Sequence, residues 1–235
     1  MDSLFVPKGS SSTTDYVINQ IKELLITGKL RPGDRLPSEF ELAQSLGVSR
    51  GSVRSAMKVF EVCGIMDIRQ GDGTYISSGL NPKRFNPLVL SLSLLAPDAT
   101  ELTKFREKIE LDIAELIIKN PDLSRAVLPK LEANLEEARE LRAQSSSIEA
   151  LATNDASFHM LLASGCGNIV FETVYNFILE YFFSSILNSY LYQNLGEVAL
   201  ADHQRIYEPL SQGNYSMVKD AIVDSMQYVY DILEK

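Results

Sequence analysis

Residues 38–54 read Ser-Glu-Phe-Glu-Leu-Ala-Gln-Ser-Leu-Gly-Val-Ser-Arg-Gly-Ser-Val-Arg, and this segment determines how the N-terminal part of the chain folds. Ser38 and Glu41 have the spacing of a capping box, in which a hydroxyl and a carboxylate each satisfy a free backbone N–H. The helix that this box opens is barely two turns long, because a glycine follows it. Ser49 then caps a second helix over residues 50–62. Two short helices joined by a tight turn predict a helix-turn-helix.

The segments on either side of these helices complete a winged helix. Before them, residues 16–25 carry apolar side chains three and four positions apart, which predicts a helix. Residues 30–37 form a loop, because two prolines exclude a helix there. After the helix pair, residues 65–69 and 74–76 flank Gln70-Gly71-Asp72-Gly73, a turn that predicts a β-hairpin.

The second helix of such a pair enters the major groove of DNA, and the side chains at its start reach the bases. Here these side chains are Ser49, Arg50, Ser52 and Arg54, with Lys58 one turn further on. The alternative is that the three cations form only a solvated helix face. We favour DNA binding, because the charges coincide with the correct helix, its cap and the hairpin.

Composition excludes several other classes of protein. Of 235 residues, 45% are hydrophobic, which is enough for a sizeable core and excludes a disordered or fibrous chain. No apolar run approaches the ~20 residues of a membrane span, and Met1–Ser12 lacks the features of a signal peptide. Two cysteines make no disulfide framework. We therefore expect a cytoplasmic protein with no membrane partner.

The formal net charge of −9 is unevenly distributed. Residues 1–80 carry nine basic and nine acidic side chains, whereas residues 81–235 carry 13 basic and 22 acidic ones. The N-terminal part can therefore gather positive charge on one face although the whole chain is acidic. The turn-rich stretch Ser77–Pro82 marks a domain boundary. Together with the helix and hairpin motifs it divides the chain into an N-terminal arm over 1–13, a winged helix over 14–78, a linker over 79–87 and a second domain over 88–235.

The second domain is predicted to be entirely helical. Prolines, glycines and a run of serines mark the helix ends, and the expected spans are 88–95, 98–119, 122–144, 147–164, 168–193, 197–212 and 214–234. Such helices predict a bundle of six to seven helices that can enclose a cavity. The predicted fold class is thus mainly α: a winged helix-turn-helix with a small β-hairpin wing, followed by an all-α bundle.

The N-terminal motifs resemble those of GntR-type bacterial transcription regulators. Pro32–Glu39, Leu46–Arg50, Val53–Ala56 and Gly71–Thr74 carry the resemblance, which covers roughly residues 14–77. It implies operator contacts by Ser49, Arg50, Ser52 and Arg54 and by the wing-tip residues Gln70 and Gly71; we add Arg35, Ser38 and Lys58 as candidate DNA contacts. Phe40 departs from the pattern, since relatives often have an arginine there.

The second domain resembles the FCD effector-binding domain of the FadR branch. The residues that carry this resemblance are Arg106, Glu110, Asp155, Phe158, His159, Ser164, Gly165, Gly167, Asn168, Asp202, His203, Gly213 and Asn214. The resemblance implies a homodimer that binds double-stranded operator DNA and a small-molecule effector. Arg106, Asn168 and Ser225 are the candidate effector-binding residues.

Both histidines of the chain fall where many FCD domains bind a divalent metal. Asp155 and His159 are four positions apart and so share a helix face, while His203 comes from another helix. One carboxylate and two imidazoles suit Zn, Ni, Fe or Mn. The family pattern has a third histidine where this chain has Ser225, and a hydroxyl is a poor ligand. A weakened three-ligand metal site and a metal-free pocket, in which the histidines bind the effector directly, both remain open.

Arg106 is the candidate anchor for an effector carboxylate, since a guanidinium binds a carboxylate with two hydrogen bonds. The alternative is an internal salt bridge to Glu110. The expected function is a ligand-responsive transcriptional regulator, most simply a repressor, that senses a small carboxylate. A regulator that responds to acyl-CoA or to another ligand without a metal is the alternative, as is a scaffold with a vestigial pocket. A metal-dependent enzyme is disfavoured, because nothing supplies a general base or nucleophile beside the histidines.

Overall fold

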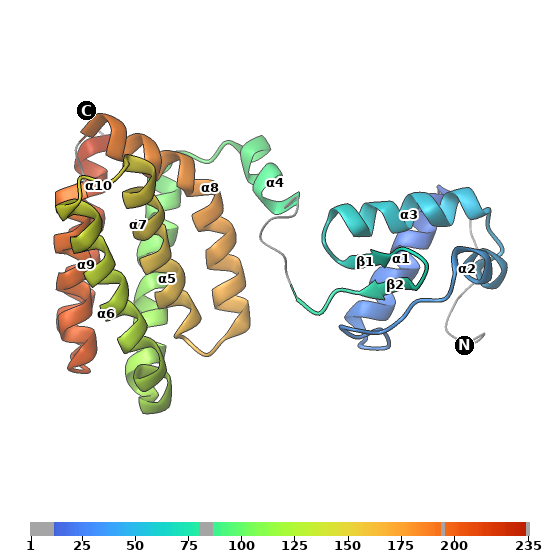
Figure 1. Ribbon diagram of the computed structural model, residues 1–235, viewed down its shortest axis with the longest axis horizontal. Helices are drawn as coiled ribbons and strands as arrows, with labels where there is room; N and C mark the ends of the chain where they lie inside the picture. The colour runs from blue at the N-terminus through green and yellow to red at the C-terminus, as the bar shows by residue number, and fades with distance from the viewer. Residues whose placement is uncertain (1–11, 80–86, 194–195, 234–235) are drawn as a thin grey trace. The chain divides into compact units, whose positions relative to one another are not determined.

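The computed structural model describes residues 12–79, 87–193 and 196–233. The chain divides into two compact units, Met1–Pro87 and Leu88–Lys235 (Figure 1). The N-terminal arm predicted for 1–13 and the linker predicted for 79–87 lie almost entirely outside the described residues. Each unit has its own apolar core and is described by itself.

The first unit is a winged helix. Its elements are α1 (Thr13–Ile26), α2 (Glu39–Leu46), α3 (Arg50–Val62), β1 (Met66–Arg69) and β2 (Gly73–Ile76). The two strands are antiparallel, with Met66 opposite Ile76 and Arg69 opposite Gly73. The order of helices and strands matches the winged helix that the sequence predicts.

Local chemistry fixes the turn between α2 and α3. The capping box is present, since Ser38 accepts from the Glu41 N–H and the Glu41 carboxylate accepts from the Ser38 N–H. Gly47 ends α2 at φ 64°, a left-handed conformation that costs glycine little. Ser49 caps α3 by accepting from the Ser52 N–H at 3.1 Å. The turn directs one side of α3 into the core, where Val53 is fully buried.

The loop before α2 pairs with strand β2 and adds a third segment to the hairpin, which the sequence did not predict. The Leu36 N–H donates to the Thr74 carbonyl, the Ile76 N–H donates to the Asp34 carbonyl, and Arg35 forms an isolated bridge with Tyr75. The prolines at either end of the 30–37 loop exclude a helix but leave the residues between them free to pair with β2. Leu36 is thereby buried in the same core as α3.

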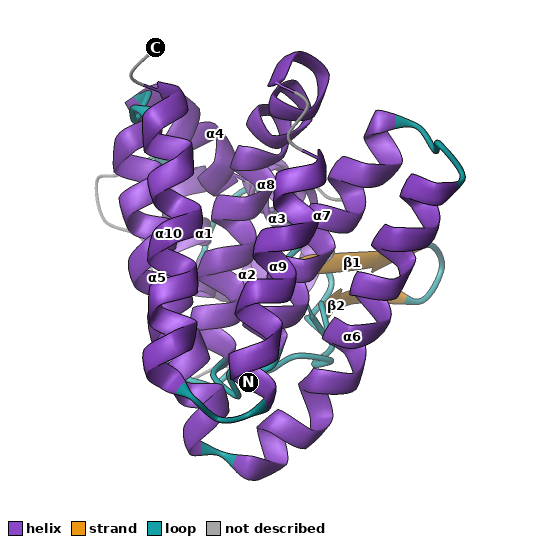
Figure 2. Ribbon diagram, turned by 90° about the vertical axis from the view of Figure 1, so that its left-hand side faces the viewer, coloured by secondary structure: helices purple, strands orange, loops and turns teal. Residues whose placement is uncertain are grey.

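The second unit contains seven helices among the described residues: α4 (Pro87–Leu95), α5 (Ala99–Lys119), α6 (Pro121–Ala143), α7 (Ile148–Ser164), α8 (Ile169–Gln193), α9 (Gly196–Ser211) and α10 (Tyr215–Leu233). Within the described ranges, Figure 2 shows strands only in the β1–β2 hairpin. The predicted fold class is confirmed, and the predicted helix spans agree to within one or two residues.

Helix α7 lies inside the bundle, packed against α6 and α8 and also in contact with α5 and α9. Phe158 on α7 and Tyr175 on α8 are fully buried in the main core of this unit. Residues on the inner face of α7 therefore meet side chains from four other helices. No described helix is both long enough and apolar enough to cross a bilayer.

We expect Gly165→Ala to destabilise the bundle. Gly165 is buried at the end of α7, and a Cβ there would come within 2.6–2.8 Å of the Val127 side chain of α6. Overpacking of this kind costs about 1–3 kcal/mol, measurable by urea unfolding. The double variant Gly165→Ala/Val127→Ala should cost less than the sum of the two single variants. Additive costs would show that this contact is not the reason for the glycine.

Candidate functional site

Helix α3 presents a polar side to solvent. Arg50 at its first position and Arg54 one turn later are exposed, whereas Val53 and Met57 are buried. Ser49 and Ser52 lie at the helix start, with their hydroxyl oxygens 2.8 Å apart. The predicted contact residues of this helix are therefore exposed or partly exposed and lie in its first turns.

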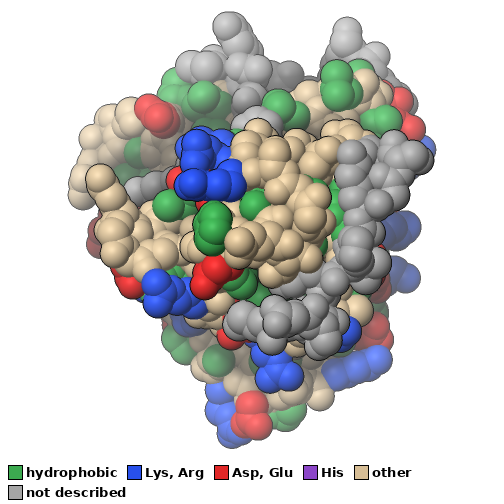
Figure 3. Space-filling view, turned by 90° about the vertical axis from the view of Figure 1, so that its right-hand side faces the viewer, with side chains coloured by type: hydrophobic (Ala, Val, Ile, Leu, Met, Phe, Trp, Pro, Cys, Tyr) green, Lys and Arg blue, Asp and Glu red, His purple; other side chains and the backbone are tan. Residues whose placement is uncertain are grey.

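Two of the α3 cations are engaged in ion pairs. Arg54 donates to the Glu39 carboxylate from Nε at 3.0–3.1 Å and from Nη2 at 2.7 Å. Lys58 Nζ lies 2.6 Å from Glu61 Oε2. The Arg54 hydrogen bond is the main reason why the pKa of Glu39 is lowered. Figure 3 shows a face of the molecule on which acidic side chains lie next to several Lys and Arg groups.

The wing tip carries two more candidate residues. Gln70 and Gly71 are exposed in the turn between β1 and β2. Arg35 supports this turn by donating from Nη2 to the Asp72 carbonyl, and Arg69 stacks over the Tyr75 ring at 4.2 Å. The predicted role of Arg35 in DNA contact thus coexists with a structural one.

Two residues at the start of α2, Ser38 and Phe40, are also exposed. The Ser38 hydroxyl caps the helix, so its predicted DNA contact would have to coexist with the capping box. Phe40 is 52% exposed although it is a large aromatic. An apolar ring therefore lies in solvent at the second position of α2.

The bundle interior brings three metal-type ligands together. Asp155 and His159 on α7 and His203 on α9 are all buried, and one ligand atom from each lies within 4.8 Å of the others. His159 Nε2 lies 3.2 Å from His203 Nε2, and His203 Nε2 lies 3.5 Å from Asp155 Oδ1. The residues predicted as metal ligands thus converge from two helices.

A second layer of charge surrounds His159. Glu110 on α5 is fully buried, and its Oε1 lies 3.1 Å from His159 Nδ1 and 3.3 Å from Arg106 Nη2. The Tyr175 hydroxyl donates to the same oxygen. Arg106 Nη2 also lies 3.1 Å from His159 Nε2. The predicted anchor Arg106 therefore touches both Glu110, the alternative partner, and the histidine cluster.

The electrostatics of this cluster set its ionisation. Burial raises the pKa of Glu110, but His159 and Arg106 lower it more, to about 2. Burial opposes the charge of Arg106, yet Tyr175 and Glu110 raise its pKa above the ordinary value. Burial lowers the pKa of His203 to about 3. At neutral pH the cluster thus holds a carboxylate, a guanidinium and a neutral His203.

The donor set fits a divalent ion. Two imidazole nitrogens that each bind zinc at about 2.0–2.1 Å lie roughly 3–3.5 Å apart, and the two Nε2 atoms are 3.2 Å apart. A neutral His203 has the lone pair that a metal needs. An ion on His159 Nε2 would have to displace Arg106 from that nitrogen.

Two predicted effector residues have local roles. Asn168 is exposed, and its side-chain oxygen accepts from the Val170 and Phe171 N–H groups at the start of α8. The Ser225 hydroxyl donates to the Ile222 carbonyl of its own helix at 2.8 Å. Neither residue is part of the ligand set of Asp155, His159 and His203.

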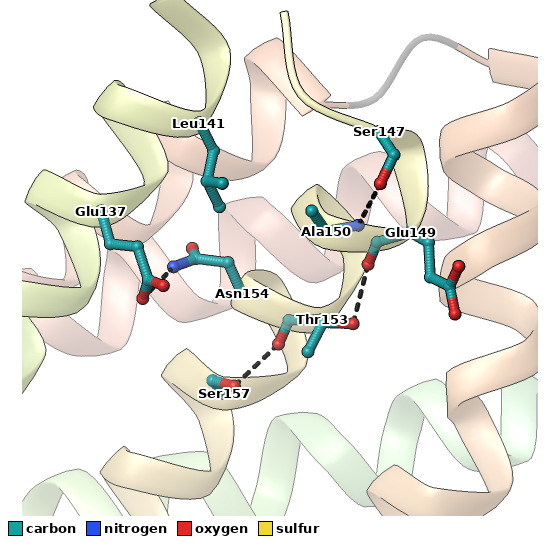
Figure 4. A pocket seen from close by; sticks show the side chains of 8 residues that line it. All are labelled: Glu137, Leu141, Ser147, Glu149, Ala150, Thr153, Asn154 and Ser157. Atoms are coloured by element: carbon teal, nitrogen blue, oxygen red, sulfur yellow. Dashed lines mark hydrogen bonds between the residues drawn. The ribbon is translucent and has the colours of Figure 1, made fainter. Parts of the chain in front are cut away.

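A separate hollow of about 410 Å³ opens between α6 and α7. Figure 4 shows its lining residues, among which Asn154 points toward Glu137 and donates to its carboxylate at 3.0 Å. Ser147, Thr153 and Ser157 bond to backbone groups of α7. The polar groups of the hollow are thus largely satisfied by their own helices, and it shares no lining residue with the buried cluster.

Sequence reasoning missed part of the cluster. From the sequence, Glu110 is assigned no role except as the alternative partner of Arg106, and Tyr175 is assigned no role. Phe158 stacks on the His203 ring at 4.0 Å between centroids and 7° between planes. The i, i+4 spacing of Arg106 and Glu110 was a usable signal, whereas nothing in the sequence links Tyr175 to Glu110.

Both halves of the chain match known family models. Residues 13–76 match the model described as bacterial regulatory proteins, gntR family. Residues 101–228 match the model described as FCD domain. The two matches cover the winged helix and the helical bundle from α5 into α10.

Individual proteins are similar over most of the chain. The HTH-type transcriptional regulator LutR of Bacillus subtilis is 27% identical over 219 residues, covering 89% of this chain and 96% of that protein. The Uxu operon transcriptional regulator of Escherichia coli is 30% identical over 156 residues, covering 63% and 56%. The solved structure of Streptococcus agalactiae GntR superimposes with a TM-score of 0.65 at 26% identity, covering 92% of this chain and 98% of that one.

We expect His203 to make the bundle less stable in acid. Its folded pKa of about 3 lies below the ordinary value near 6.5, so the unfolded chain binds the proton more readily and stability falls as the pH drops from 6.5 toward 3. Between pH 7 and pH 5, protonation linked to His203 should lower the free energy of unfolding by about 1–2 kcal/mol. Urea unfolding in the presence of a chelator should show that His203→Gln loses less unfolding free energy over this pH range than the parent protein does. Equal losses in both proteins would contradict the assignment.

Proposed function

Because the chain belongs to the GntR family of bacterial regulatory proteins and carries an FCD domain, we propose that it is a homodimeric repressor whose bundle senses a small carboxylate through a bound divalent metal. The winged helix binds operator DNA, and the effector weakens that binding. The observation that carries the proposal is the buried cluster of Arg106, Asp155, His159 and His203.

The exposed side of α3 supports the DNA-binding half of the proposal. Arg50 and Arg54 lie on the part of the helix that enters the major groove in such motifs. Lys58 lies one turn further on and would contact phosphate, which positions a protein on DNA without reading its sequence. Phe40 would bring an apolar ring to the same surface, where it suits a thymine methyl group.

The buried cluster supports the sensing half of the proposal. Among the described residues, Arg106 Nε and Glu110 Oε2 are buried and have no hydrogen-bond partner. Unpaired buried polar atoms cost about 1–3 kcal/mol each, and a ligand that bonds to Arg106 would remove part of this cost. A carboxylate is the natural match for a planar guanidinium.

The same cluster would hold the metal. Asp155, His159 and His203 would be its three protein ligands, and the ion would supply open coordination positions for an effector carboxylate. The hydroxyl of Ser225, where relatives have a third histidine, bonds to its own helix instead. Three ligands rather than four would leave the affinity for metal modest and the site open to the effector.

We expect metal uptake to depend on both histidines and to improve when the missing ligand is restored. Dialysed protein should bind Zn²⁺ or Ni²⁺ stoichiometrically in calorimetric titrations, and His159→Ala/His203→Ala should not. Ser225→His should bind the metal more tightly than the parent chain, because it adds a fourth ligand. If the parent binds no metal and Ser225→His restores none, the effector is bound without one.

We expect Arg106 to be needed for the effector response. Short-chain mono-, di- and tricarboxylates, tested with and without Zn²⁺, should include one that releases a fluorescent duplex selected with the protein. Arg106→Lys keeps a positive charge beside Glu110 but lacks the planar fork, so it should keep DNA binding and lose roughly tenfold or more in effector sensitivity. Acyl-CoA thioesters form the second arm. If only the thioesters release the duplex, the effector is an acyl thioester and not a free carboxylate. If neither class releases it, the protein senses neither class.

A further inference from the structure

The first turn of α2 brings an acidic side chain onto the exposed side of the recognition helix. Glu39 follows the cap residue of α2, and its carboxylate accepts from two nitrogens of Arg54, at 3.0–3.1 Å from Nε and at 2.7 Å from Nη2. The two residues are 15 positions apart, so the contact joins the two helices of the helix-turn-helix rather than neighbours on one helix.

An acid at this place needs an explanation. Every cation near the phosphates strengthens DNA binding, and a carboxylate on the same surface weakens it. Glu39 stays ionised at neutral pH, because the Arg54 hydrogen bond and the charges of Arg54 and Arg50 lower the pKa of its carboxyl. Glu39 therefore does not serve to raise the non-specific affinity of this surface for DNA.

The geometry of the pair supplies another reason. A guanidinium has five N–H groups in one plane, and Glu39 occupies the edge formed by Nε and Nη2. The remaining edge, formed by Nη1 and Nη2, carries two parallel N–H groups, which match O6 and N7 of guanine in the major groove. The Arg54 side chain is 65% exposed, so this edge is open to solvent.

We propose that Glu39 determines base specificity by holding the Arg54 guanidinium so that its free edge reads a guanine in the operator. A freely rotating arginine can bind either phosphate or base, whereas a fixed one loses less freedom on binding and presents one pattern. The inference rests on the proposed contact of Arg54 with DNA. Glu39 acts through Arg54 and is a positioning residue.

The test uses the full-length protein and duplexes selected from a randomised library. The selected duplex should contain a guanine at which substitution by adenine weakens binding of the parent protein by roughly 5- to 150-fold. Arg54→Ala should lose this discrimination. Glu39→Gln should lose most of it while binding a scrambled duplex at least as tightly as the parent does, since a negative charge has been removed. The double variant Glu39→Gln/Arg54→Ala should discriminate guanine from adenine no less than Arg54→Ala alone, because Glu39 acts only through Arg54.

A matched control comes from the same helix-turn-helix. Glu61 pairs with Lys58 at 2.6 Å, and its side chain is 29% exposed, against 30% for Glu39. Glu61→Gln therefore removes an equal charge and an ion pair of similar exposure. It should leave the guanine-to-adenine discrimination unchanged, because a lysine in contact with phosphate reads no base.

Each other outcome has a defined meaning. If Glu39→Gln binds the selected duplex more tightly with undiminished discrimination, Glu39 only restrains Arg54 and the inference is overturned. If Glu39→Gln weakens selected and scrambled duplexes by the same factor, its role is structural and the inference is again overturned. If Arg54→Ala keeps the discrimination, the proposed Arg54 contact itself is wrong, which is a failure distinct from that of Glu39.

Discussion

The buried charge of Glu110 constrains the arrangement of three helices of the bundle. Its carboxylate is fully buried, and an isolated charge in such a place would cost several kcal/mol. Arg106 from its own helix, His159 from α7 and Tyr175 from α8 all contact its Oε1 atom. Three helices must therefore keep their relative positions for this charge to stay compensated.

The same constraint explains how a ligand can move helices. His159 contacts Glu110 through Nδ1, and its Nε2 faces both Arg106 and His203 of α9. Under the proposed function, a ligand that draws Arg106 away from Glu110 would change the compensation of the buried charge and so would favour a different packing of α5, α7 and α9. Coupling to DNA binding then requires that the ligand prefer one packing over the other, typically by about 1–3 kcal/mol.

Sequence reasoning predicts the elements well because their ends are encoded locally. The Ser38 box, the Ser49 cap and the left-handed Gly47 are short-range signals, and they fix the boundaries of α2 and α3. Pairing of the 33–36 segment with β2 was missed, because backbone hydrogen bonds between distant segments leave no side-chain pattern. Convergence of Asp155, His159 and His203 was anticipated only through resemblance to a family, since spacing alone brings the first two together.

What the sequence could not supply are contacts between side chains far apart along the chain. Glu39 and Arg54 lie in two different helices, and Glu110 and Tyr175 are 65 positions apart. The two carboxylates also differ physically. Glu39 is partly exposed, so salt screens its pairing with Arg54 and the contact contributes little to stability. Glu110 is buried, and removal of its partners would leave an uncompensated charge. Under the proposed function, the exposed pair can therefore be tuned for DNA recognition at little cost to the fold, whereas the buried one would link ligand binding to the fold itself.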